Sequence, residues 1–128
     1  MEFKMKTEGF YVELPYGRLD ISGNEESGFR PYQLLISSLA VCSGGILRTI
    51  LAKKRLKVDD IRIIADAERN PNRANRIEKI SLHFKIKGSH LNDEKIAKAL
   101  ELTTKNCAMV QSVIDSIEVC KTYEIIDS

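Results

Sequence analysis

The sequence has no large excess of charge of either sign, because 20 lysine and arginine residues face 18 aspartate and glutamate residues and leave a formal net charge of +2. So small a surplus argues against binding a nucleic-acid backbone by bulk electrostatics, and we expect no nucleic-acid partner. Repeats and low-complexity tracts are also missing. With 43% hydrophobic and 30% charged residues over 128 positions, the composition predicts a globular chain that forms one domain, residues 1–128.

Cysteine is scarce, and its three residues, at positions 42, 107 and 120, are an odd number. The sequence contains no Cys-x-x-Cys pair and no cluster of histidine and cysteine, so neither a disulfide framework nor a metal site is indicated. We expect no metal and no cofactor. The first residues alternate apolar and polar side chains and lack the apolar stretch of a signal peptide. The expected location is therefore the reducing cytoplasm.

Only one long hydrophobic run is present, between Leu34 and Leu51. Its apolar residues recur every three or four positions, which predicts one long helix that Pro31 is well suited to open. A run of about 18 to 20 such residues can cross a bilayer. Arg48 lies inside the run, however, and the flanking segments are amphipathic, so we expect a core helix and no membrane partner.

The remainder of the chain shows the two-residue alternation of strands, interrupted by turn-forming residues and two shorter helical patterns. Turns are predicted at residues 15–17 and 70–72. The predicted strands lie near Phe3 and Met5 and at residues 10–14, 19–21, 61–68, 80–86 and 117–123. Helices are predicted after Asn92, which can cap the first, and after a pause at Asn106. Consecutive hairpins favour an antiparallel α+β fold.

Two of the cysteines have settings that suit reactive thiols. Cys42 lies on the long predicted helix beside Ser43, Gly44 and Gly45, whose small side chains leave room next to a sulfur atom. Cys107 lies where the sequence pattern predicts the start of a helix, and the positive end of a helix dipole lowers a thiol pKa. Simple packing of a small apolar side chain is the alternative at both positions. Cys120, in the last predicted strand, is interpreted as structural.

Three motifs in this order resemble the family of osmotically induced (OsmC) and organic hydroperoxide resistance (Ohr) proteins. They are Pro31-Tyr32-Gln33-Leu34-Leu35, Ser38-Leu39-Ala40-Val41-Cys42 and Asn106-Cys107-Ala108-Met109-Val110. The resemblance extends over nearly the whole chain. It implies an α+β fold in which an antiparallel sheet wraps around a long central helix, and an intertwined homodimer.

The same resemblance implies thiol-dependent reduction of organic or hydrogen peroxides. Cys42 would be the peroxidatic cysteine, which attacks the peroxide and becomes a sulfenic acid, and Cys107 the resolving cysteine, which converts it to a disulfide. An external dithiol would be the reductant. The family also implies an arginine beside the attacking thiolate, for which Arg18 fits better than Arg30.

One position departs from the family pattern. The strongest peroxidases of the family have a glutamate just after the helix-opening proline, to pair with the arginine, and this sequence has Tyr32. The departure motivates an alternative function, in which the dimer binds a small hydrophobic ligand at the subunit interface without peroxidase activity. A structural or interaction protein, with all three cysteines as packing residues, is the third possibility.

Overall fold

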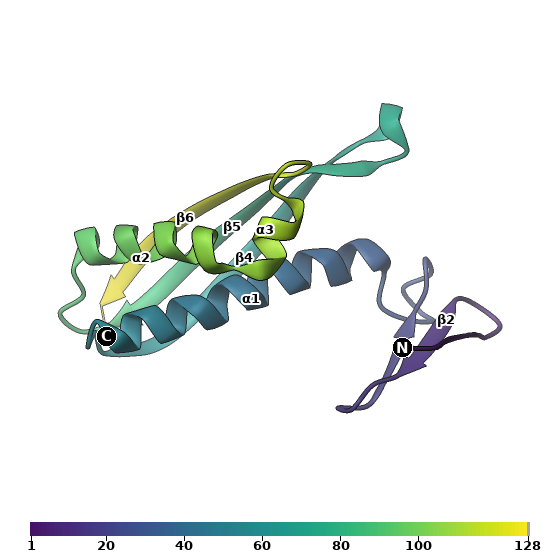
Figure 1. Cartoon of the computed structure of the whole chain (residues 1–128), viewed down its shortest axis with the longest axis horizontal. Helices are drawn as coiled ribbons and strands as arrows, with labels where there is room; N and C mark the ends of the chain where they lie inside the picture. Colours follow the sequence, from purple (N-terminus) through teal and green to yellow (C-terminus); the bar gives the residue numbers. More distant parts are fainter. Residues whose placement is uncertain (128) are drawn as a thin grey trace. The chain divides into compact units, whose positions relative to one another are not determined.

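The computed structural model describes residues 1–127, which form two compact units, residues 1–37 and residues 38–127. A long helix, α1 (Pro31–Lys53), begins in the first unit and continues into the second (Figure 1). Each unit has its own three-stranded sheet. The assignment of residues 1–128 to a single domain stays a prediction.

The N-terminal unit is an antiparallel sheet in the order β1-β2-β3. Its strands are β1 (Phe3–Met5), β2 (Phe10–Glu13) and β3 (Arg18–Ile21). Gly9 has a φ of 89°, a conformation that suits glycine, and its carbonyl accepts the Lys6 N–H at 3.0 Å to close the first turn. The predicted strands and the turn at residues 15–17 are confirmed.

Helix α1 begins at the proline that the sequence indicated. Pro31 is its first residue, where a missing N–H costs nothing, and the side-chain oxygen of Gln33 accepts the backbone N–H of Arg30 at 3.2 Å. Leu39, Leu47 and Leu51 are at most 1% exposed and share one face of the helix. By length and composition α1 is also able to cross a membrane, but this buried face is compatible with a core helix.

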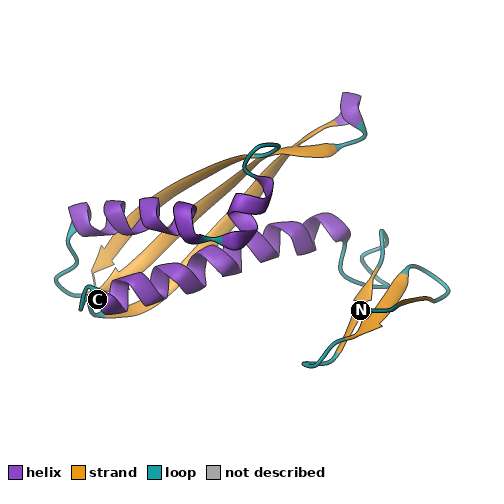
Figure 2. Ribbon diagram, in the orientation of Figure 1, coloured by secondary structure: helices purple, strands orange, loops and turns teal. Residues whose placement is uncertain are grey.

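The second unit contains a sheet in the order β4-β5-β6, together with helices α2 and α3 (Figure 2). Its elements are β4 (Val58–Asn70), the short 3-10 helix η1 (Pro71–Arg73), β5 (Arg76–Gly88), α2 (Asp93–Asn106), α3 (Ala108–Val113) and β6 (Glu118–Asp127). Ile80, Leu82, Phe84 and Ile86 of β5 are 0% exposed. One face of the central strand is therefore completely covered.

The sheet of the second unit is only partly antiparallel. Strands β4 and β5 form the predicted hairpin, and the η1 turn begins at Asn70, whose side chain accepts the N–H of Asn72 at 3.0 Å. Strand β6 pairs with β5 in parallel. The reason is that α2 and α3 stand between them in the sequence, and such a helical crossover returns the chain to the same end of the sheet.

We expect Asn92→Ala to destabilise the second unit by about 1 kcal/mol, because it removes the cap of helix α2. The side-chain oxygen of Asn92 accepts the N–H of Lys95 at 3.0 Å. Urea unfolding measures the change. Asn92→Asp retains the acceptor and should stay within a few tenths of wild type, and equal losses in both variants would contradict a capping role.

Candidate functional site

Cys42 and Cys107 reach the candidate site from separate elements. Cys42 lies in the middle of α1, whereas Cys107 is the residue that separates α2 from α3. The backbone of Cys107 is held on both sides, because its N–H donates to the Thr103 carbonyl and its carbonyl accepts the Gln111 N–H, each at 2.9 Å. This linker position is extended, with φ −83° and ψ 109°. The pause predicted at Asn106 therefore corresponds to this hydrogen-bonded residue between the two helices.

The structure brings these two thiols together although 107 − 42 = 65 positions separate them in the sequence. Both are free thiols, and they lie close enough for each to shift the pKa of the other through a hydrogen-bonding interaction. The hydroxyl of Ser43 donates to the Cys107 sulfur at 3.7 Å. Backbone N–H groups from the first residues of α3, among them that of Met109, also interact with the two sulfurs.

The surroundings shift the two thiols in opposite directions. The hydrogen bond with Cys107 is the main reason why the pKa of Cys42 is raised. Burial acts to raise the pKa of Cys107, but hydrogen bonds from Cys42, the Val110 N–H and Ser43 outweigh it, so the pKa of Cys107 is lowered. The first proton is thus lost by a coupled pair, and the negative charge is favoured on Cys107.

The two thiols also differ in their exposure to solvent. Cys107 is 0% exposed, whereas Cys42 is only partly buried. The more ionisable thiol is therefore the less accessible one. Cys42 is the sulfur that an incoming molecule can reach.

Ser43→Ala should raise the pKa of the Cys107 thiol, because the hydroxyl that stabilises the thiolate is lost. A modest hydrogen bond corresponds to about a two- to tenfold change in thiolate population, so the thiolate that Cys107 contributes near neutral pH should fall by about that factor. A pH titration of the ultraviolet thiolate absorbance measures it, with Ser112→Ala as the control, since the hydroxyl of Ser112 donates to the Ala108 carbonyl at 2.7 Å. Identical effects of both substitutions would contradict the assignment.

Lys121 is a residue of the site that sequence reasoning missed. It lies on β6 opposite Leu82, on the face of the sheet that is covered. Its ammonium is buried and has no hydrogen-bond partner among residues 1–127, and it interacts electrostatically with Cys107 and Cys42. A signal was available in the sequence, because Lys121 shares the alternation of Ile117, Val119 and Tyr123.

Both candidate arginines lie in the N-terminal unit. Arg18 bonds the carboxylate of Asp20, with its closest nitrogen at 3.0 Å, and stacks over the ring of Tyr11 at 3.8 Å. The hydrogen bond to Asp20 raises the already high pKa of Arg18. Arg30 lies over the ring of Tyr32 at 5.0 Å. A role for Arg18 beside the thiolate stays a prediction.

Cys120, interpreted as structural, and His83 lie on the other face of the second sheet. Cys120 is opposite Ser81, and His83 bonds Thr122 at 2.7 Å and Glu124 at 3.1 Å. This side of the strands alternates with the side that carries Leu82 and Lys121. In the part of the chain that the structure describes, no group of three or more histidine, cysteine or acidic residues is arranged to hold a metal ion.

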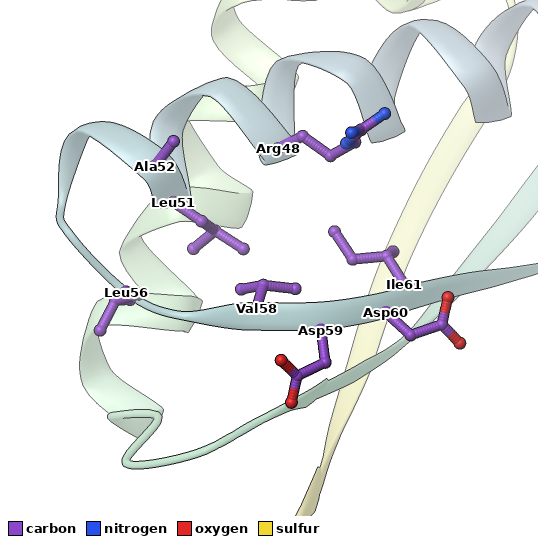
Figure 3. Close-up of a pocket in the computed structure, with 8 residues that line it drawn as sticks. All are labelled: Arg48, Leu51, Ala52, Leu56, Val58, Asp59, Asp60 and Ile61. Atoms are coloured by element: carbon purple, nitrogen blue, oxygen red, sulfur yellow. The ribbon is translucent and has the colours of Figure 1, made fainter. Parts of the chain in front are cut away.

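Two hollows lie in the second unit. One, of about 410 Å³, lies between the end of α1 and the start of β4. Figure 3 shows Arg48 on its helix side and Asp59 and Asp60 on its strand side. Another, of about 290 Å³, lies between α2 and β6 and is lined in part by Glu101 and Lys121. The second hollow therefore borders the lysine of the site.

Comparison with known proteins places this geometry in a family. A family model described as "OsmC-like protein" matches residues 23–120. The chain is 26% identical to Protein YhfA of Escherichia coli K12 over 97 residues, 75% of this chain and 72% of that protein.

Solved structures share the fold. A hypothetical protein from Aquifex aeolicus VF5 aligns with a TM-score of 0.89 at 24% identity, over 99% of this chain and 95% of that one. The organic hydroperoxide resistance protein OsmC of Legionella pneumophila aligns with a TM-score of 0.75 at 15% identity, over 96% and 93% of the two chains. OhrB of Bacillus subtilis aligns at 0.66 and 16%, over 97% and 98%.

Proposed function

The chain belongs to the OsmC-like protein family, and on that premise we propose that it reduces organic or hydrogen peroxides with the thiols of Cys42 and Cys107. One observation carries the proposal. Two free cysteines from distant parts of the sequence lie in one folded unit, close enough for each to shift the pKa of the other, and this proximity supports a disulfide between them. Structural relatives named for hydroperoxide resistance support the same chemistry.

The proposed cycle has three reactants, which are the protein with its two thiols, the peroxide and an external dithiol. The Cys42 thiolate attacks one peroxide oxygen, the O–O bond breaks, and the alkoxide leaves and takes a proton to become the alcohol. Cys42 is then a sulfenic acid. The sulfur of Cys107 attacks it, hydroxide leaves as water after protonation, and a disulfide is formed. An external dithiol reduces this disulfide and is itself oxidised.

The choice of Cys42 as the attacking thiol rests on access, since Cys107 is 0% exposed. The raised pKa of Cys42 and the lowered pKa of Cys107 mean that, once the pair has lost one proton, the charge is favoured on the buried sulfur. When a peroxide approaches, the proton of Cys42 moves to Cys107. Cys107 is therefore the internal base for the first step and the resolving thiol for the second.

The proposed partner is a second copy of the chain, and the proposed location is the cytoplasm. Val41 on α1 and Ile64 on β4 are 70% and 53% exposed, an apolar exposure that a homodimer would cover. A cytoplasm keeps thiols reduced and supplies dithiol reductants, as the cycle requires.

The direct test is steady-state reduction of an alkyl hydroperoxide by the protein with a dithiol such as dithiothreitol. Turnover should depend on protein concentration and saturate with hydroperoxide, after correction for the reaction of the dithiol alone. A rate no faster than that background would reject the proposed function.

The alternative, a dimer that binds a small hydrophobic ligand without redox chemistry, is favoured by one observation, the raised pKa of Cys42. A thiol that holds its proton is a poor nucleophile unless its neighbour accepts that proton. Under this alternative, Cys42 would alkylate no faster than an ordinary thiol, and a hydrophobic fluorescent probe would bind wild type and Cys42→Ser alike.

A further inference from the structure

A buried ammonium group without a hydrogen-bond partner calls for an explanation. The nitrogen of Lys121 is inaccessible to solvent and finds no such partner in residues 1–127. Burial of an unpaired cation is costly, so a buried lysine tends to lose its proton unless a negative charge lies near it. The groups that interact electrostatically with this amine are the thiols of Cys107 and Cys42.

The position of Lys121 follows from the parallel pairing of β6. Its neighbour across the ladder is Leu82, which is 0% exposed and lies on the covered face of β5. The other ionisable groups on this side are Glu101 of α2 and Tyr123 of β6, which line the adjoining hollow. Tyr123 is bonded elsewhere, because its hydroxyl donates to the Asp93 carboxylate at 2.6 Å.

We propose that Lys121 is the cation that stabilises the thiolate of the Cys42–Cys107 pair, a role that sequence reasoning assigned to Arg18. The inference deepens the proposed function, since a thiolate held in this way is what peroxide reduction requires. It concerns thiol ionisation alone, so it can be tested without peroxide.

The effects on the pKa of the Lys121 amine are consistent with this role. Burial lowers the pKa of the Lys121 amine, and the neighbouring thiols act in the opposite direction. As a thiol ionises, the amine beside it therefore binds its proton more tightly, and the ammonium in turn favours the thiolate. Above the thiol pKa the charges of the thiolate and the ammonium compensate each other.

Lys121→Met tests the proposal, because methionine keeps an unbranched apolar stem and removes the charge. The pH dependence of thiol alkylation, measured in a Cys120→Ser background, should move to higher pH. The alkylation rate at neutral pH should fall by about tenfold or more, the effect of removing a neighbouring opposite charge. Lys121→Arg should largely restore the wild-type profile, and Lys85→Met on the opposite face should not change it.

Superposable pH profiles for wild type and Lys121→Met would overturn the proposal. If that variant does not fold, an NMR titration of the Lys121 side chain decides instead. The amine pKa should drop further when both Cys42 and Cys107 are replaced by serine, and an unchanged value would also overturn it. A shifted profile without any peroxide turnover would leave this role standing and reject the proposed function, whereas turnover with an unshifted profile would do the reverse.

Discussion

Replacing Cys42 with serine should lower peroxide turnover by about three orders of magnitude or more, to the level of the dithiol alone. A serine hydroxyl keeps its proton at neutral pH, and its oxygen does not form the sulfenic acid that the cycle needs. Stopped-flow mixing with an alkyl hydroperoxide, with alcohol formed as the readout, measures the first step separately from reduction by the dithiol.

Cys107→Ser separates attack from resolution. This variant should still react once with the peroxide, more slowly because the internal base is missing, and should then accumulate a Cys42 sulfenic acid that a dimedone probe traps. Cys120→Ser is the matched control and should behave as wild type, because Cys120 lies opposite Ser81 on the other face of the sheet. Retained turnover in Cys42→Ser, with loss in Cys107→Ser, would reverse the two roles.

Phe84→Ala should destabilise the protein by about 3 to 5 kcal/mol, the largest stability effect that we expect. Phe84 is 0% exposed in the central strand β5, and its removal leaves a cavity on the face that the thiol site depends on. Urea or thermal unfolding measures the loss.

Phe3→Ala is the control for this substitution, because the same atoms are removed from a side chain that is 49% exposed. Its effect should be about 1 kcal/mol or less. Comparable losses for the two variants would show that the covered face of β5 is not the main source of stability.

The secondary structure could be predicted from local patterns, since alternation and helical spacing report burial directly. The apolar positions of residues 80–86 correctly marked the strand that became β5, and Asn92 correctly marked the start of α2. The parallel course of β6 was missed, because the hairpin pattern was extended to a strand whose partner is set by the intervening helices.

At the site, the sequence identified the two cysteines but not their electrostatics. The lowered pKa of Cys107 was anticipated from its place before a helix, and the structure adds Ser43 and Cys42 as donors. The raised pKa of Cys42 depends on a neighbour 65 positions away (107 − 42 = 65), which no local pattern reports. Lys121 was overlooked because a lone lysine in a strand is usually a solvated residue.

Redox chemistry here requires that the sulfurs of Cys42 and Cys107 bond to each other when a peroxide is reduced. One equivalent of an alkyl hydroperoxide, followed by alkylation of the remaining thiols and peptide mapping by mass spectrometry, tests this directly. We predict a disulfide between Cys42 and Cys107 within one chain, one equivalent of alcohol, and an alkylated Cys120. Recovery of Cys42 and Cys107 as alkylated thiols, with the hydroperoxide intact, would contradict it.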